Sequence, residues 1–142
     1  MAIPLPRENA IDNENDKFIG IRLPLERSDG IEGYFKSTET TFEAVKENIK
    51  NLLNTKTGER LFNPTIGTGF HNLLFENIDN EMLDTIQDQI NDVFSVWMPF
   101  ITIVKLDISI DDNNFSNKLN IFLEFFMNQN PNILESVQLT IG

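Results

Sequence analysis

The chain has 142 residues and a formal net charge of −11, with 22 acidic and 11 basic residues. This length predicts one domain, and an apolar share of 40 % with twelve Phe predicts a packed core. Basic residues spread among twice as many acidic ones argue against nucleic-acid binding, and the absence of cysteine excludes disulfides and thiolate metal sites.

Residues 1–32 carry scattered charges around one short apolar run. We predict an extended N-terminal arm over residues 1–32, with a short strand near Phe18–Arg22, and a single α+β domain over residues 33–142. The arm is either a frayed terminus or a segment that becomes ordered only against a neighbour. Its first residues lack the apolar run of a secretory signal, and the chain has no run of apolar residues long enough to span a membrane.

A first helix is predicted from Thr40 to about Asn54–Lys56. Thr40 and Glu43 have the spacing of a capping box, and Gly58 is free to take a positive φ just beyond the helix. Apolar residues recur at helical spacing and predict one buried face, formed by Phe42, Val45, Ile49, Leu52 and Leu53.

A short helix is expected over Phe70–Phe75, and a long one begins after Asp79, its N-cap, and ends before Pro99. The apolar stripe of the long helix is typical of core packing and consists of Met82, Leu83, Ile86, Ile90, Val93, Phe94 and Trp97.

After Pro99 the apolar period changes from 3.6 to 2. Three strands are predicted, separated by turns at Asp112–Asn114 and Asn130–Asn132. Their buried positions are Val104, Leu106, Ile108 and Ile110, then Leu119, Ile121, Leu123, Phe125 and Met127, then Val137, Leu139 and Ile141. The fold class is therefore α+β, with two main helices and a short one packed on a C-terminal antiparallel three-stranded meander.

We predict no catalytic, cofactor-binding or metal site. His71 is the only histidine, so it has no second histidine or cysteine with which to form a triad or a zinc site. Asp107, Asp111 and Asp112 lack the order of a calcium loop. A peptidoglycan hydrolase using Glu59 and Glu76 is the alternative, but Arg60 beside Glu59 favours the ionised carboxylate, which is unsuitable for a general acid.

The segment Thr57–Glu76 joins turn glycines, an adjacent Glu59–Arg60 pair, Pro64 and an apolar run in T-G-E-R-L-F-N-P-T-I-G-T-G-F-H-N-L-L-F-E. This pattern resembles that of the contractile-tail baseplate wedge family, the small sheath-initiating proteins of tailed phages. Counterparts of that family occur in type VI secretion and in phage-tail-like bacteriocins. The resemblance implies a structural protein of the virion tail baseplate, made in the host cytoplasm. Its implied partners are wedge proteins and the tail sheath protein, with no nucleic acid, membrane or small-molecule substrate.

The resemblance also implies functional residues. Glu59, Arg60 and Pro64 match the motif through which the initiator meets the wedge core, and we add Gly67; an internal salt bridge that fixes the loop is the alternative role of the charged pair. The last strand is an edge candidate for strand addition by the sheath, through Val137, Leu139, Thr140 and Ile141. Phe122 and Phe126 fall on the outer face of the middle strand and imply a cover, either from this chain or from a partner.

Overall fold

The structure is a computed structural model that describes residues 20–22, 25–28, 35–38, 40–75, 79–113 and 116–142. Its contacts divide the chain into two units, residues 1–51 and residues 52–142.

The first unit contains a short antiparallel ribbon of β1 (Gly20–Ile21) and β2 (Ser37–Thr38). The Arg22 N–H donates to the Lys36 carbonyl at 2.9 Å and continues the pairing. The predicted strand near Phe18–Arg22 is thus confirmed for its described residues. Most of the predicted arm lies outside the described residues, and the boundary at residue 32 stays a prediction.

Helix α1 (Thr41–Asn54) starts where the capping residues predict. The Glu43 N–H donates to Thr40 Oγ1 at 3.2 Å, and the Glu43 carboxylate accepts from the Arg22 guanidinium. All five apolar residues of the predicted face are buried, which confirms that face. The helix ends at Asn54, and Gly58 has a φ of +90° as expected.

The second unit contains a 3-10 helix, η2 (Phe70–Phe75), and helix α2 (Asn80–Trp97). The Asp79 side chain caps α2 by accepting from the Met82 N–H at 2.9 Å, and the helix ends just before Pro99, as predicted. On the apolar stripe of α2, full burial is confined to three residues one helical turn apart, Ile86, Ile90 and Phe94.

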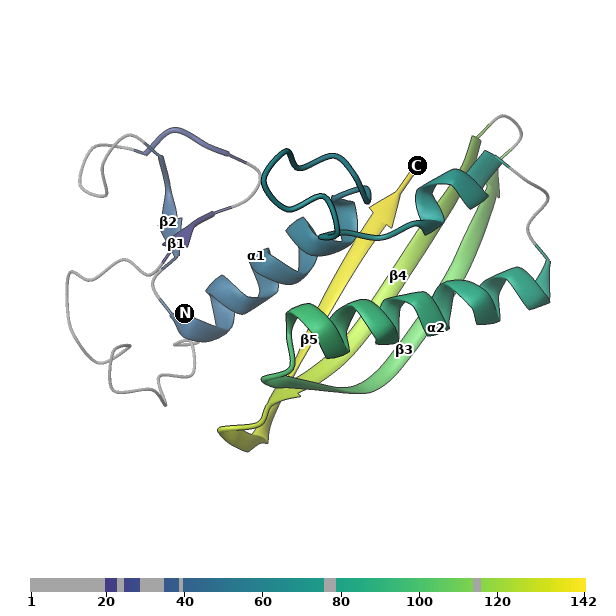
Figure 1. Cartoon of the computed structure of the whole chain (residues 1–142). Coiled ribbons are helices and arrows are strands. Elements are labelled where there is room, and N and C mark those ends of the chain that lie inside the picture. Colours follow the sequence, from purple (N-terminus) through teal and green to yellow (C-terminus); the bar gives the residue numbers. More distant parts are fainter. Residues whose placement is uncertain (1–19, 23–24, 29–34, 39, 76–78, 114–115) are drawn as a thin grey trace. The chain divides into compact units, whose positions relative to one another are not determined.

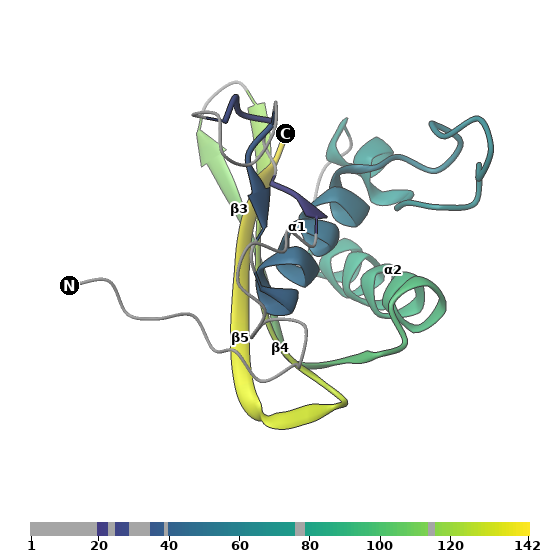
Figure 2. The same ribbon diagram turned by 90° about the vertical axis from the view of Figure 1, so that its left-hand side faces the viewer.

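Three long strands form one antiparallel sheet in the order β3-β4-β5, comprising β3 (Ile101–Asn113), β4 (Ser116–Met127) and β5 (Asn130–Ile141). Helix α2 lies along one face of this sheet (Figures 1 and 2), and Gln87 Nε2 donates to the Leu106 carbonyl at 3.0 Å. The predicted inner residues of β4 and β5 are all buried, so the α+β class and the meander are confirmed.

One predicted inner position is wrong: Val104 is 54 % exposed. The register shifts there, because Ile103 pairs with Phe125 whereas Lys105 pairs with Glu124. Val104 is therefore the extra residue of a β-bulge, which displaces one side chain from the alternation. The other three predicted inner residues of β3, Leu106, Ile108 and Ile110, are half-buried and not fully buried.

The two predicted turns differ from the structure where it describes them. Asp112 and Asn113 pair with β4 and belong to the strand, and Asn114 lies outside the described residues. The second turn occupies residues 128–129, and the segment predicted to form it is the irregular start of β5. In that irregular stretch Met127 pairs with Asn130, but Phe126 pairs with Leu134.

Candidate functional site

The loop between α1 and η2 is closed at its base by backbone hydrogen bonds. The Thr68 N–H donates to the Thr55 carbonyl at 2.9 Å, and the Thr57 N–H donates to the Thr68 carbonyl at 3.3 Å. Nearer the tip, the Gly58 N–H donates to the Pro64 carbonyl at 2.7 Å. These bonds hold the two sides of the loop together and leave residues 59–63 as its tip.

Gly67 makes this closure possible. Its φ of +119° lies in the region that favours glycine, and an added Cβ would lie 2.5 Å from the Thr55 carbonyl oxygen. Gly67 is also buried. Of the residues predicted for the wedge interface, Gly67 therefore has a clear role inside the loop itself.

The adjacent charged residues Glu59 and Arg60 have different surroundings. The Glu59 carboxylate accepts from the Lys56 N–H at 3.0 Å, and the Glu59 N–H donates to the Lys56 carbonyl at 3.1 Å. Arg60 is exposed and makes no ion pair or hydrogen bond with any other residue that the structure describes. Within these residues, Glu59 and Pro64 brace the loop, and the Arg60 guanidinium faces solvent.

Two apolar residues at the tip were not predicted from the sequence to be functional. Leu61 is 94 % exposed and Phe62 is 98 % exposed, whereas the next most exposed large apolar residue among those described, Val96, is 66 % exposed. The signal that could have revealed them is a pair of large apolar residues between Gly58 and Pro64, in a segment without helical or strand periodicity.

His71 packs beneath the loop and is 7 % exposed. Its Nδ1 lies 3.2 Å from Thr68 Oγ1, and its ring stacks on that of Phe70 with centroids 4.8 Å apart. Burial lowers the pKa of His71, since it disfavours the charged imidazolium. The imidazole therefore helps to support the loop, and no group of potential metal ligands occurs among the described residues.

The second predicted site is the β5 edge. The side chains of Val137, Leu139 and Ile141 are buried, and the Thr140 hydroxyl donates to Asn120 Oδ1 at 2.6 Å. Among the strands described, β5 pairs with β4 alone, so its other side is a sheet edge. The two candidate sites thus belong to different elements, the loop before η2 and strand β5.

The outer face of β4 is partly covered by this chain. Phe122 and Phe126 are half-buried, and Lys105 Nζ lies 5.8 Å from the centroid of the Phe122 ring. Phe126 is paired with Leu134, which is 54 % exposed. Lys105 therefore covers part of this face, and Leu134 extends its apolar surface.

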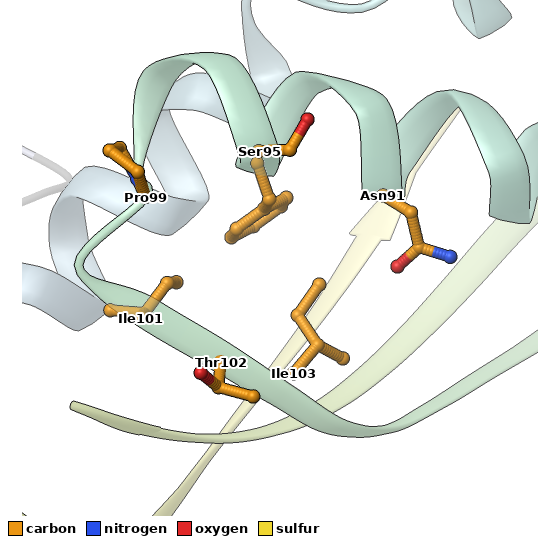
Figure 3. A pocket seen from close by; sticks show the side chains of 7 residues that line it. Asn91, Ser95, Pro99, Ile101, Thr102 and Ile103 are labelled. Carbon is orange, nitrogen blue, oxygen red and sulfur yellow. The ribbon is translucent and has the colours of Figure 1, made fainter. Parts of the chain in front are cut away.

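A pocket of about 370 Å³ lies between the C-terminal half of α2 and the start of β3 (Figure 3). None of its lining residues is titratable; they are Asn91, Phe94, Ser95, Pro99, Ile101, Thr102 and Ile103. General acid–base hydrolysis requires ionisable groups, which this pocket lacks.

Of the carboxylates considered for hydrolysis, Glu59 is exposed on the loop and Glu76 lies outside the described residues. No helix in the described part of the chain is long and apolar enough to cross a membrane.

Comparison with known proteins gives one family, described as baseplate wedge protein gp25, which matches residues 39–132. No curated protein matches the chain significantly. Similar solved structures include a proposed tail lysozyme from Geobacter sulfurreducens, at 22 % identity and a TM-score of 0.65, covering 75 % of this chain and 94 % of that one.

Two baseplate structures are also similar. A chain of the anti-feeding prophage baseplate has 24 % identity and a TM-score of 0.61, and the match covers 75 % of this chain and 82 % of that one. A chain of the type VI secretion baseplate complex has 14 % identity and a TM-score of 0.54, covering 69 % and 89 %. At these identities the three structures establish the shared fold alone.

Proposed function

Because the chain belongs to the baseplate wedge protein gp25 family of contractile tails, we propose that it connects the wedge core to the first sheath ring and nucleates sheath assembly. In this proposal the chain is made in the host cytoplasm and is incorporated into the tail baseplate. The loop tip carrying Arg60 binds wedge proteins, and the edge of β5 receives a strand from the sheath protein. The observation that carries the proposal is the family match over residues 39–132.

The choice between the two sheet edges follows from their regularity. The β3 edge is interrupted by the bulge at Val104 and carries the Lys105–Asp107 ion pair, at 2.8 Å. Bulges and charges are the features that protect an edge from pairing. The regular segment Val137–Ile141 of β5 carries no charged side chain and pairs with β4 without a shift. These differences favour strand addition at β5.

We infer that the chain is not an enzyme. The similar Geobacter protein is named as a tail lysozyme, but that name describes only that protein. At 22 % identity, the similarity between the two chains is one of fold. The family to which this chain belongs is named for a baseplate component. A hydrolase remains the alternative, and a peptidoglycan assay separates the two functions.

A proline at Thr140 tests the strand-addition step. Proline removes a backbone N–H, and its ring obstructs a neighbouring strand. Residue 140 is next to the last residue of β5, so we expect a small effect on folding. Thr140→Pro should enter the baseplate but reduce sheath assembly on it, as seen by electron microscopy of tails.

The matched control is Thr140→Ala, which keeps the backbone donor and loses only the exposed hydroxyl contact with Asn120. This variant should assemble sheath normally. If Thr140→Pro also nucleates sheath at the wild-type level, the β5 edge is not the attachment site.

A further inference from the structure

The loop tip presents two neighbouring apolar side chains that make almost no contact with their own chain. Leu61 and Phe62 are 94 % and 98 % exposed. Single exposed apolar residues are common on protein surfaces, but adjacent large ones at the end of a closed loop point to an interaction surface. Such a pair gains free energy whenever a partner removes it from water.

The loop holds the tip ready for binding. The Gly58–Pro64 hydrogen bond joins its two sides at 2.7 Å, and the Ile66 N–H donates to the Asn63 carbonyl at 3.2 Å. A tip that is already ordered loses less conformational entropy on association. The conformation is therefore suited to insertion of the side chains without prior folding of the loop.

The neighbouring charge defines the partner. Arg60 directly precedes the apolar pair and has no acidic partner among the residues that the structure describes. Arginine beside aromatic and apolar anchors is the composition found at the centre of tight protein interfaces, where the guanidinium pairs with a carboxylate. An anionic membrane is a poor alternative for a chain with a net charge of −11.

We propose that Leu61 and Phe62 insert together into an apolar pocket of a neighbouring baseplate protein, with Arg60 bound to a carboxylate at the rim of that pocket. This inference rests on the proposed wedge function and assigns the binding energy to Arg60, Leu61 and Phe62 instead of Glu59 and Pro64. Glu59, Pro64 and Gly67 then act by shaping the loop that presents the tip.

Leu61→Ala and Phe62→Ala test the inference, with incorporation into purified baseplates as the measurement. Each should weaken incorporation by about ten- to a hundredfold, the factor expected for losing the burial of one such side chain. Both variants should unfold at the wild-type temperature, because neither side chain contributes to the core. The matched control is Val96→Ala, an apolar truncation at a position 66 % exposed on α2, which should incorporate normally.

The charged contact has its own test. Arg60→Glu should exclude the chain from baseplates, Arg60→Ala should weaken incorporation, and Arg60→Lys should restore it only in part, since a point charge does not reproduce bidentate geometry. If all three variants are incorporated at the wild-type level, Arg60 does not bind a carboxylate at the rim of the pocket.

The remaining outcomes separate this inference from the proposed function. If the wild-type chain is present in baseplates and the double variant Leu61→Ala/Phe62→Ala is present in equal amount, the apolar anchor is wrong and the wedge function stands. If the wild-type chain is absent from baseplates, the wedge function itself fails. Two other results would contradict insertion into a pocket of another baseplate protein. One is that the chain floats with phosphatidylglycerol vesicles and Phe62→Ala does not, and the other is that the chain forms a dimer in sedimentation and Phe62→Ala does not.

Discussion

Replacing Gly67 by alanine should destabilise the second unit through two separate effects. The first is conformational, because a φ of +119° is one that residues with a Cβ rarely adopt. Such strained backbone conformations cost on the order of 1–3 kcal/mol. The second effect is steric: the new Cβ would lie 2.5 Å from the Thr55 carbonyl oxygen and 2.9 Å from the Lys56 carbonyl carbon.

Both contacts are with backbone, so no side chain can rotate to relieve them. The loop would have to open, and the hydrogen bond from the Thr68 N–H to the Thr55 carbonyl would lengthen or break. Losing one such bond costs about 0.5–1.5 kcal/mol. When this cost is added to that of the strained φ, Gly67→Ala should lower the free energy of unfolding by roughly 2–4 kcal/mol.

Two other glycines in the same loop provide graded controls. Gly58 has a φ of +90° but an added Cβ would meet no atom within 4 Å, so Gly58→Ala should cost only the conformational term, about 1–2 kcal/mol. Gly69 has no positive φ, and its nearest neighbour would be Gln89 Oε1 at 3.8 Å. Gly69→Ala should be neutral or stabilising by up to about 1 kcal/mol.

Urea denaturation of the three variants measures these differences. In thermal unfolding, Gly67→Ala should lower the midpoint by roughly 6–12 °C, at about 3 °C per kcal/mol for a chain of this size. The reasoning is refuted if Gly67→Ala is no less stable than Gly58→Ala, because the close approach to Thr55 would then contribute nothing.

Two further predictions concern pH and catalysis. Burial lowers the pKa of His71, so its contribution to stability is complete above the ordinary value of about 6.5 and is lost as the pH falls through the folded-state pKa. The free energy of unfolding should therefore fall less for His71→Gln than for the wild type between about pH 7.5 and 5, as measured by urea denaturation at each pH. An equal fall in the two proteins would contradict this. The purified chain should not clear peptidoglycan, whereas clearing that Glu59→Gln abolishes would establish the hydrolase.

The sequence alone determined the elements whose signals are local. The face of α1 from Phe42 to Leu53, the cap at Asp79 and the stop before Pro99 depend on residues within a few positions of each other. The alternation along β4 is equally local, and each of its predicted inner residues is buried. Helical and strand periods and capping groups act within one element, so the α+β class could be predicted without tertiary contacts.

Only the tertiary structure decided the features that depend on residues distant in the chain. Val104 leaves the inner face because β4 sets the register of β3, and a cross-strand pairing is not encoded in the alternation of one strand. Gly67 is required because the chain returns to Thr55, and Glu59 braces the loop because its carboxylate meets the Lys56 N–H. Leu61 and Phe62 are exposed because the closed loop directs them away from the core, and an apolar residue in an irregular segment gives no period from which its direction could be predicted.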